Sequence, residues 1–563
     1  MKKAIPVIIA VALIIIIGAG YIGMKFLERY SYSKEYADLN EYYAVSGGED
    51  TAIVLQDEII EEKAVLRDGS YYFDYETVRK YFNDRFYVDT TESLLLYTTA
   101  VDTIRTEIGS STFTQDGAPV EESYTISFYE GEKLYVAADY VKKFTNLSYE
   151  AFTEPNRLQV YTQWGEIQTA TIKKDTSVRY KGGVKSDILK DVQGGDTVTV
   201  LEEMETWTKV KTADAVIGYV ENKRLSEITT TEQIPVTDYV EPEFTSLTRD
   251  HKINLAWHQV WTADANSTFS AMMASAKSVN VISPTWFSLS DNEGNFTNIA
   301  SRTYVEQAHG MGLEVWALID NFNTEIDTKT ILSSTTKRTY LIGNLVQTVK
   351  DYGIDGINVD FEQVAMDAGD DYIQFIRELS VACRKEGIVL SIDNYVPTGY
   401  TDHYNREEQG IFVDYVVIMG YDEYYAGSAT AGPVASINFV EEGITKTLEV
   451  VPANKVINAV PFYTRVWKTE NGTLTSEAVS MDVATQFIAN NGIETYWNEE
   501  TCHNYGEAQI GDVFYQVWLE DTQALQDKLN VMSQYDLGGV AEWKLGLENA
   551  AAWDLIENYM NGQ

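Results

Sequence analysis

An alternation of apolar strands and amphipathic helices, repeated through residues 248–563, limits the fold more than any other feature of this sequence. The predicted strands are Ile253–Val260, Val279–Leu289, Glu314–Asn321, Gly356–Glu362, Val389–Val396, Val413–Tyr421, Lys455–Tyr463 and Gly538–Trp543. One stretch between them places Leu341, Leu345 and Val349 at helical spacing. The pattern predicts an α/β protein with a closed (β/α)8 TIM barrel, whose functional groups lie at the C-terminal ends of the strands.

Cysteine and histidine are too few and too scattered to predict a metal site. The chain has 2 cysteines and 5 histidines, and the histidines show no metal-ligand spacing. Cys383 shares an apolar helical face with Phe375 and Leu379, which predicts a small core residue rather than a nucleophile. The acids around Gly369 favour a solvated helix N-terminus over a calcium site. We therefore predict neither a metal nor a cofactor.

The segment Asp355–Gln363 (DGINVDFEQ) has the strongest chemical pattern. Alternate side chains of a strand share a face, so Asn358, Asp360 and Glu362 are predicted to point into the barrel. An unpaired carboxylate in that position costs several kcal/mol, roughly, or raises its pKa until it is neutral. Two acids two residues apart also raise the proton affinity of at least one of them. A carboxylic acid that stays protonated near neutral pH is suited to general acid catalysis.

These residues match the Asp-x-x-Asp-x-Asp-x-Glu signature of glycoside hydrolase family 18, the chitinase and endo-β-N-acetylglucosaminidase family, at all but one place. The segment resembles this family further in Met419-Gly420-Tyr421-Asp422 at the end of the sixth strand and in Trp543 at the end of the eighth. The segment Val460–Trp467, which closes the seventh strand and contains Tyr463 and Arg465, also agrees. The resemblance implies a TIM barrel and hydrolysis of acetamido-sugar linkages without a metal.

The family's mechanism is substrate-assisted and retaining. It implies that Glu362 protonates the glycosidic oxygen and then acts as a base toward water. Asp360 is expected to orient the acetamido N–H of the sugar, and Tyr421 to bond its carbonyl. The remaining residues are expected to bind substrate: Asp422, Met419, Trp543, Asn358, Tyr463, Arg465 and Tyr395. Trp257 and Trp286, on the first two strands, are predicted with equal weight to stack on sugars or to belong to the core.

Asn358 is the one departure, because the family commonly has Asp there. An amide can still hydrogen-bond Asp360 but adds no negative charge, so we expect Asp360 to ionise more readily. The flanking segments Ser283–Phe287 and Asp393–Pro397 resemble the spore- and wall-lytic branch of the family more than the secreted chitin-degrading enzymes.

The N-terminus predicts export. Met1-Lys2-Lys3 precedes an uncharged apolar run that ends at Gly23 and is close to the length a bilayer core requires. We therefore predict that residues 1–29 form an uncleaved signal-anchor helix, with a cleaved signal peptide and secretion as the alternative. Residues 30–48 read as a stalk. Both alternatives place the rest of the chain outside the cytoplasmic membrane, in a bacterial cell envelope.

Two smaller modules are predicted before the barrel. Residues 49–162 contain two similar segments, each a strand, a short helix and a strand pair, and loosely resemble the small α+β module found at the N-terminus of copper amine oxidases. Residues 163–229 resemble the bacterial Src-homology-3-type barrel of wall-associated proteins, through Gly195-Asp196, Trp207–Val210 and Gly218–Val220. Wall binding and a rigid spacer remain equal interpretations. Residues 230–247 are a linker, and the barrel domain is predicted to span 248–563.

Charge excludes one class of partner. Lys and Arg total 43 and Asp and Glu total 85, a formal charge of −42, which disfavours nucleic acid binding. We predict an envelope glycosidase that hydrolyses β-1,4 links after N-acetylglucosamine, in peptidoglycan. The alternatives are a chitinase and a non-catalytic, lectin-like glycan-binding protein.

Overall fold

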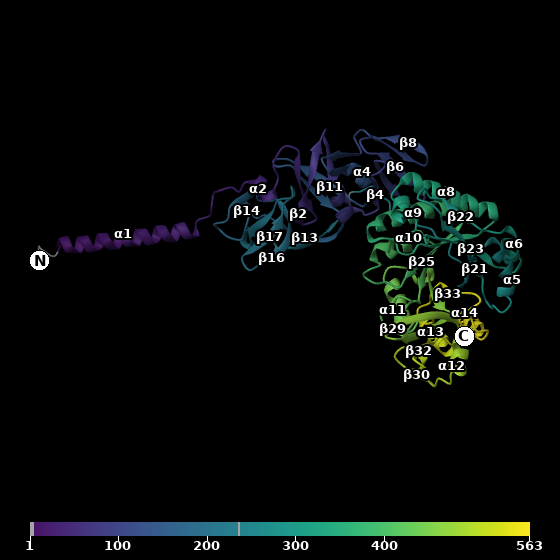
Figure 1. The fold of residues 1–563 in the computed structure, drawn as a ribbon. Helices are drawn as coiled ribbons and strands as arrows, with labels where there is room; N and C mark the ends of the chain where they lie inside the picture. Colours follow the sequence, from purple (N-terminus) through teal and green to yellow (C-terminus); the bar gives the residue numbers. More distant parts are fainter. Residues whose placement is uncertain (1–4, 235–236, 563) are drawn as a thin grey trace. The chain divides into compact units, whose positions relative to one another are not determined.

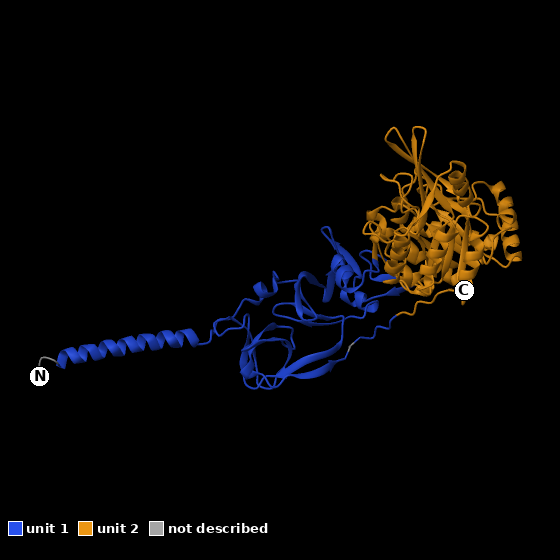
Figure 2. Ribbon diagram, turned by 90° about the horizontal axis from the view of Figure 1, so that it is seen from below, with its two compact units in different colours: residues 1–86, 106–113, 119–241 blue, residues 87–105, 114–118, 242–563 orange. Residues whose placement is uncertain are grey.

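The computed structural model describes residues 5–234 and 237–562. The chain divides into two compact units (Figure 2). The first comprises residues 1–86, 106–113 and 119–241, and the second comprises residues 87–105, 114–118 and 242–563. The boundary therefore passes through the predicted 49–162 module, part of which belongs to the unit that contains the barrel.

The N-terminal helix α1 (Ile5–Tyr30) is long and apolar enough to cross a membrane, with a mean hydropathy of 2.8 and none of that window buried. Its residues have no contact with a protein core, which distinguishes it from a buried helix. The basic residues predicted to precede it, Lys2 and Lys3, lie outside the described residues.

A seven-stranded sheet organises the next part of the first unit. Its strands, in spatial order, are β11 (Ser148–Phe152), β12 (Arg157–Tyr161), β1 (Asp50–Leu55), β2 (Glu58–Arg67), β3 (Ser70–Asp74), β10 (Lys133–Ala137) and β9 (Ser127–Glu130). Strand β3 is followed by the short helices α3 (Tyr75–Thr77) and η1 (Val78–Phe82), and β10 by α4 (Ala138–Lys143). Both similar segments thus contain a strand followed by helix.

The segment resembling an Src-homology-3 barrel forms a second seven-stranded sheet. Its spatial order is β15 (Ile188–Val192), β14 (Thr176–Arg179), β18 (Ile217–Glu221), β17 (Trp207–Lys211), β16 (Thr197–Glu203), β13 (Gly165–Thr171) and β19 (Thr229–Gln233). Alternating side chains supply the core, which includes Val178, Val198 and Val210.

Eight parallel strands close the predicted barrel. They are β20 (Ile253–His258), β21 (Val281–Leu289), β23 (Glu314–Asp320), β24 (Gly356–Asp360), β25 (Val389–Tyr395), β26 (Tyr415–Met419), β27 (Val456–Pro461) and β33 (Gly539–Trp543). The pairing of β20 with β21 completes the ring, and the short β22 (Phe296–Asn298) adds to β21. Strand β24 ends at Asp360, two residues before the predicted end, so Glu362 lies just beyond the strand.

Helices surround the strands (Figure 1). They are α5 (Phe269–Met272), α6 (Arg302–Gly310), α7 (Thr328–Leu332), α8 (Thr335–Tyr352), α9 (Gly369–Glu386), α10 (Arg406–Phe412), α11 (Ile437–Leu448), α13 (Thr522–Met532) and α14 (Ala552–Met560). The main apolar cluster lies between strands and helices and includes Cys383, as predicted. A smaller cluster fills the barrel interior and includes Trp257, Trp316 and Tyr415.

Residues 463–519 depart from the β/α alternation. They form a separate five-stranded antiparallel sheet, with helix α12 (Met481–Asn490) packed on it. Its strands, in spatial order, are β29 (Thr473–Ser480), β28 (Tyr463–Glu470), β32 (Val513–Leu519), β31 (His503–Ile510) and β30 (Thr495–Asn498). This insertion follows β27 and was not predicted.

Residues 87–105, here called the arm, belong to the same unit as the barrel and cap helix α8. Asp89 Oδ2 accepts a hydrogen bond from Thr335 N at 2.6 Å, and a carboxylate oxygen of Glu92 accepts one from Thr336 N at 2.8 Å. Both carboxylates satisfy N–H groups that the first turn of a helix leaves free.

A buried polar network links the arm to helices α8 and α9. Arg338 is fully buried and donates to both carboxylate oxygens of Glu378, at 3.2 and 3.0 Å. Tyr87 of the arm donates to Asp371 at 2.6 Å, and Gln374 donates to Thr98 at 3.0 Å. The arm strands β4 (Phe86–Asp89) and β5 (Leu94–Thr98) belong to a five-stranded sheet with β6 (Thr103–Glu107), β7 (Thr112–Gln115) and β8 (Ala118–Glu121).

Candidate active site

The predicted polar row occupies the C-terminal end of β24. Asn358 and Asp360 are buried and face the barrel interior, whereas Val359 and Phe361 pack in the outer apolar cluster. Glu362 keeps the alternation although it lies past the strand, and its side chain is half-buried. The row thus stands where TIM barrels hold their reactive groups.

Two hydrogen bonds fix the backbone of Glu362. The side chain of Asn321, just after β23, donates to the Glu362 carbonyl oxygen at 2.8 Å and accepts from its N–H at 2.9 Å. The next residue, Gln363, has a φ of 53°, in the left-handed region, so the chain turns sharply there. Asn321 therefore acts as a clamp on the residue predicted to transfer protons.

The side chain of Glu362 accepts a hydrogen bond from Tyr395 Oη at 2.6 Å. Burial raises the pKa of the Glu362 carboxyl, and the negative charges of Asp422 and Asp320 raise it further, while the bond from Tyr395 opposes them. The net shift is upward, which favours the protonated acid that general acid catalysis needs.

Asp360 is more deeply buried, with 5% of its surface exposed, and its Oδ1 has no hydrogen-bond partner. Burial raises its pKa well above the usual range, and the carboxylates of Asp393 and Glu362 add to that shift. The sequence prediction of a readily ionised Asp360 took account of position 358 alone. Burial and the Asp393 carboxylate, which that prediction did not consider, act on the pKa of Asp360 in the opposite direction.

Asn358 does not bond Asp360, because its hydrogen-bonding capacity is used elsewhere. Its Oδ1 accepts from Trp257 Nε1 at 2.9 Å and from Ser283 Oγ at 3.1 Å. Its Nδ2 donates to Ser391 Oγ at 3.1 Å and to Asp393 Oδ1 at 2.8 Å. Asn358 is therefore the centre of a buried network that joins strands β20, β21, β24 and β25.

Two acids that the sequence analysis did not name as site residues belong to this cluster. Asp320, at the end of β23, pairs in register with Asp360. Asp393 lies on β25, where Asn358 pairs with Ser391 two residues earlier. Each interrupts an apolar strand on the face that points inward. This alternation of inward and outward side chains can be read from the sequence, and it could have identified Asp320 and Asp393 as site residues.

The residues after β26 and β27 form a second group at the same end of the barrel. Asp422 Oδ1 accepts a hydrogen bond from Tyr463 Oη at 2.6 Å, and Arg465 lies 3.4 Å from the same oxygen. Burial raises the pKa of Tyr421 well above its usual value, with contributions from Asp360 and Asp393, so its hydroxyl stays protonated as a donor. Met419, which ends β26, is buried.

Of the predicted aromatic residues, two belong to the core. Trp257 and Trp286 are each 1% exposed, so neither has a face open to a sugar. Trp257 bonds Asn358 inside the barrel, and Trp286 donates to Asn266 in the outer layer. Trp543 ends β33 partly exposed, with its ring 5.8 Å from that of Trp257 in an edge-on contact. Of the three predicted tryptophans, only Trp543 is partly exposed.

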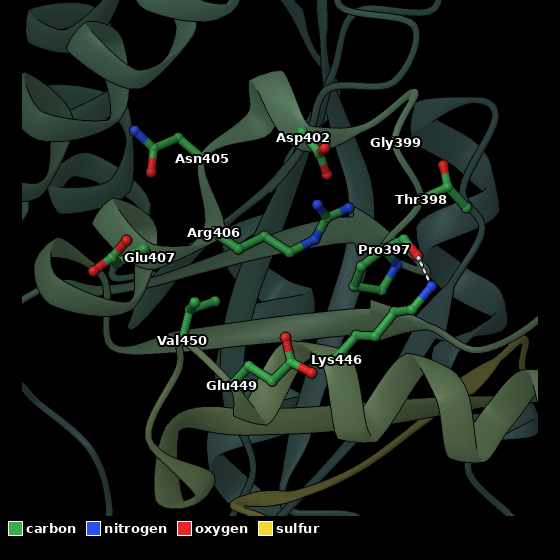
Figure 3. Close-up of a pocket in the computed structure, with 10 residues that line it drawn as sticks. All are labelled: Pro397, Thr398, Gly399, Asp402, Asn405, Arg406, Glu407, Lys446, Glu449 and Val450. Carbon is green, nitrogen blue, oxygen red and sulfur yellow. Dashed lines mark hydrogen bonds between the residues drawn. The ribbon is translucent and has the colours of Figure 1, made fainter. Parts of the chain in front are cut away.

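A cavity of about 410 Å³ lies between the chain after β25 and the end of α11 (Figure 3). Its lining includes the buried Arg406, whose guanidinium donates to the Tyr395 carbonyl oxygen at 2.9 Å and to the Thr401 carbonyl oxygen at 3.0 Å. None of the predicted site residues lines it. Arg406 thus holds the backbone of Tyr395, the residue whose hydroxyl bonds Glu362.

Two known domain families match this chain. The family described as "Glycosyl hydrolases family 18" matches residues 216–548, and "Bacterial SH3 domain" matches residues 174–226. The cortical fragment-lytic enzyme of Bacillus anthracis is 29% identical over 252 residues, 43% of this chain and 58% of its own length. The enzyme of the same name from Bacillus subtilis (strain 168) is 28% identical over 243 residues, which cover 41% of this chain and 56% of that enzyme. The chain therefore spans little more than half the length of these relatives.

Solved structures show the same fold. The chitinase from Chromobacterium violaceum ATCC 12472 matches with a TM-score of 0.50 and 22% identity, over 55% of this chain and 99% of that one. The Bacillus cereus spore cortex-lytic enzyme SleL matches with a TM-score of 0.50 and 22% identity, over 57% of this chain and 77% of that one.

Within the described residues, no group of three or more His, Cys, Asp or Glu side chains has the arrangement of a metal site.

Proposed function

Because the chain belongs to the glycosyl hydrolases of family 18, we propose that it hydrolyses β-1,4 linkages after N-acetylglucosamine in peptidoglycan, with Glu362 as general acid and base. The main support is the state of Glu362. It is half-buried, its pKa is raised, its backbone is clamped by Asn321, and its carboxyl is oriented by Tyr395.

The first step is cleavage of the glycosidic bond. Glu362 donates its proton to the glycosidic oxygen as the bond to the anomeric carbon breaks. In this mechanism the acetamido oxygen of the same sugar attacks that carbon and forms an oxazolinium ion, so no enzyme carboxylate serves as the nucleophile. The ionised Glu362 then takes a proton from water as the water oxygen bonds to the anomeric carbon. The bond between that carbon and the acetamido oxygen breaks, which opens the oxazolinium ring, and Glu362 is protonated again.

Neighbouring groups stabilise the charge that develops. Asp360 has an oxygen without a protein partner, and we assign to it the acetamido N–H of the substrate. Tyr421, protonated because of its burial, donates to the acetamido carbonyl. Asp422, held by Tyr463, bonds the hydroxyl groups of the distorted sugar. Trp543 supplies an apolar surface under the ring.

Three observations favour wall glycan as the substrate class. The Bacillus relatives are named cortical fragment-lytic enzymes. The segment 174–226 belongs to a domain family that we propose binds the cell wall. The apolar helix α1 suits an extracytoplasmic protein, and we propose that it remains as a membrane anchor.

The test is digestion of purified peptidoglycan by the chain from Tyr30 onward, with identification of the sugar at each new reducing end. Reducing N-acetylglucosamine is expected. Release of N-acetylglucosamine oligomers from chitin, but nothing from peptidoglycan, would support the chitinase alternative. Glycan binding without release from either polymer would support a lectin.

The matched variant is Glu362→Gln, which removes the proton but keeps the size and polarity of the side chain. It is expected to lower kcat by at least about a thousandfold, because both proton transfers are lost. Glycan binding, measured by pull-down with insoluble peptidoglycan, should stay within a factor of about two, since the subsites are unchanged. Equal turnover in the variant and the wild type would remove Glu362 from the mechanism.

A further inference from the structure

A layer of three acids crosses strands β23, β24 and β25 beside Glu362. Asp320 pairs in register with Asp360, and Val359 pairs with Ile392, so Asp393 follows as the neighbour of Asp360 on the other side. Asp360 and Asp393 are 5% and 2% exposed. Two carboxyls buried this closely cannot both ionise without a large electrostatic cost.

The three acids differ in their partners. Asp320 Oδ1 accepts from Ser288 Oγ at 2.7 Å and from Phe322 N at 3.1 Å. These bonds oppose the burial that raises the pKa of Asp320, without cancelling it. Asp393 receives a bond from Asn358 Nδ2 at 2.8 Å. Asn358 in turn contacts Trp257, Ser283 and Ser391. Asp393 is thus held rigidly by an amide whose position is commonly occupied by an acid in the family.

We propose that Asp393 is a positioning residue that supplies, from strand β25, the buried negative charge that an acid at position 358 would otherwise place beside Asp360. Asn358 is then the partner that orients Asp393, with the amide on β24 and the acid on the neighbouring β25. This inference rests on the proposed function, because it concerns the protonation of the same acid–base cluster.

The charges around Asp393 agree with this role. After burial, the Asp393 carboxylate is the largest cause of the raised pKa of Asp360. Burial also raises the pKa of Asp393 well above its usual value and the charge of Glu362 adds to that shift, while the hydrogen bond from Asn358 opposes it. Asp360 Oδ1 has no such donor, so of these two buried acids Asp393 is the one whose charge a hydrogen bond stabilises. Six further titratable groups interact electrostatically with Asp360, Asp393 or Glu362: Asp320, Asp422, Tyr372, Tyr395, Tyr404 and Tyr421. Arg406 acts on Tyr372 from the chain after β25.

The hydrogen-bond network would accept the exchanged pair. A carboxylate at position 358 can accept from Trp257 Nε1 and Ser283 Oγ, as the amide oxygen of Asn358 does now. An amide at position 393 can then donate a hydrogen bond to the new carboxylate at 358. Ser391 can rotate its hydroxyl from acceptor to donor. The double variant Asn358→Asp/Asp393→Asn therefore conserves charge, volume and donor count, and it moves only the location of the charge.

The experiment is a cycle of Asp393→Asn, Asn358→Asp and the double variant, with kcat measured against pH on peptidoglycan fragments. In Asp393→Asn the acid limb of the kcat–pH profile should move to lower pH by about one unit, because Asp360 then ionises more easily. Asn358→Asp, which adds an acid, should move it to higher pH. The double variant should return the limb toward the wild-type position.

A control and a second measurement separate this inference from the proposed function. Ser391→Ala removes a bond to Asn358 without changing charge, so it should lower Tm but leave the pH limbs in place. Carbon-13 NMR of carboxyl-labelled Asp follows the Asp360 titration without substrate, and its midpoint should fall in Asp393→Asn. An unmoved Asp360 midpoint in Asp393→Asn, or a double variant that titrates like Asp393→Asn, would overturn the role of Asp393 even if hydrolysis is confirmed. If no glycan is cleaved, the NMR titration still decides the inference.

Discussion

The clamp between Asn321 and Glu362 gives the sharpest test of how the barrel positions its proposed proton donor. The change is Asn321→Leu, which keeps the volume and removes both hydrogen bonds to the Glu362 backbone. Each such bond contributes about 1 kcal/mol net. Because Asn321 is only half-buried and water can replace part of the pair, we expect a loss of about 1.5 kcal/mol from both.

If that energy holds Glu362 in its reactive position, kcat should fall about tenfold, since roughly 1.4 kcal/mol corresponds to a factor of ten. KM should change by less than about twofold, because the clamp does not face the sugar. The assay is initial-rate release of reducing ends from peptidoglycan, with Tm measured in parallel.

Thr328→Val is the matched control, because Thr328 Oγ1 accepts the other bond of the Asn321 amide, at 3.0 Å. It should leave kcat within about twofold of the wild type, because both bonds to Glu362 remain. A wild-type kcat in Asn321→Leu would refute the clamp, as would an equal loss in both variants.

Three further predictions concern pH, stability and localisation. Tyr395→Phe removes a hydrogen bond that lowers the pKa of Glu362, so Glu362 should stay protonated to higher pH and the alkaline limb of kcat should move upward; an unmoved or downward limb would contradict this. Arg338→Met leaves Glu378 buried and unpaired and should cost about 3–5 kcal/mol in urea unfolding, whereas adding Glu378→Leu should recover much of that loss; equal stability of the two variants would show that the pair is not coupled. Helix α1 should retain the full chain in carbonate-washed membranes, and deletion of residues 5–30 should release it; sedimentation of both forms would point to another anchor.

The sequence was sufficient for the barrel and for the direction of its most important side chains. All eight strands were placed within a few residues, because short apolar runs separated by amphipathic helices have few other solutions. The period of two predicted that Asn358, Asp360 and Glu362 point inward. Glu362 itself lies past the end of its strand, where it continues the alternation after Phe361, which is buried in the outer cluster.

Contacts between strands were not predictable in the same way. Asn321 and Glu362 are far apart in sequence, and so are Asn358 and Asp393, so both pairs depend on the register of neighbouring strands. The two core tryptophans illustrate the same limit, since an aromatic side chain on a barrel strand suits a sugar and a core equally. The register of the neighbouring barrel strands decides which side chains surround such an aromatic residue.

The five-stranded insertion was missed although the sequence contains a turn signal for it. Asn471-Gly472 joins β28 to β29, and both residues have positive φ values, of 49° and 77°. An Asn-Gly pair between two alternating segments is the strongest short-range indication of a hairpin. The expectation of a helix after each barrel strand took precedence over that local signal.

The arm has a consequence for how such proteins evolve and are engineered. Its two carboxylates complete the first turn of α8, so a catalytic domain cut out at the linker before residue 248 would lose Asp89 and Glu92 together with the partners of Asp371 and Gln374. Gene fusions that exchange the upstream module for another would expose the same helix end and polar surface. Chimeras of this chain should therefore inherit residues 87–105 with the catalytic half, and recombination is expected to be tolerated upstream of that segment rather than in the linker.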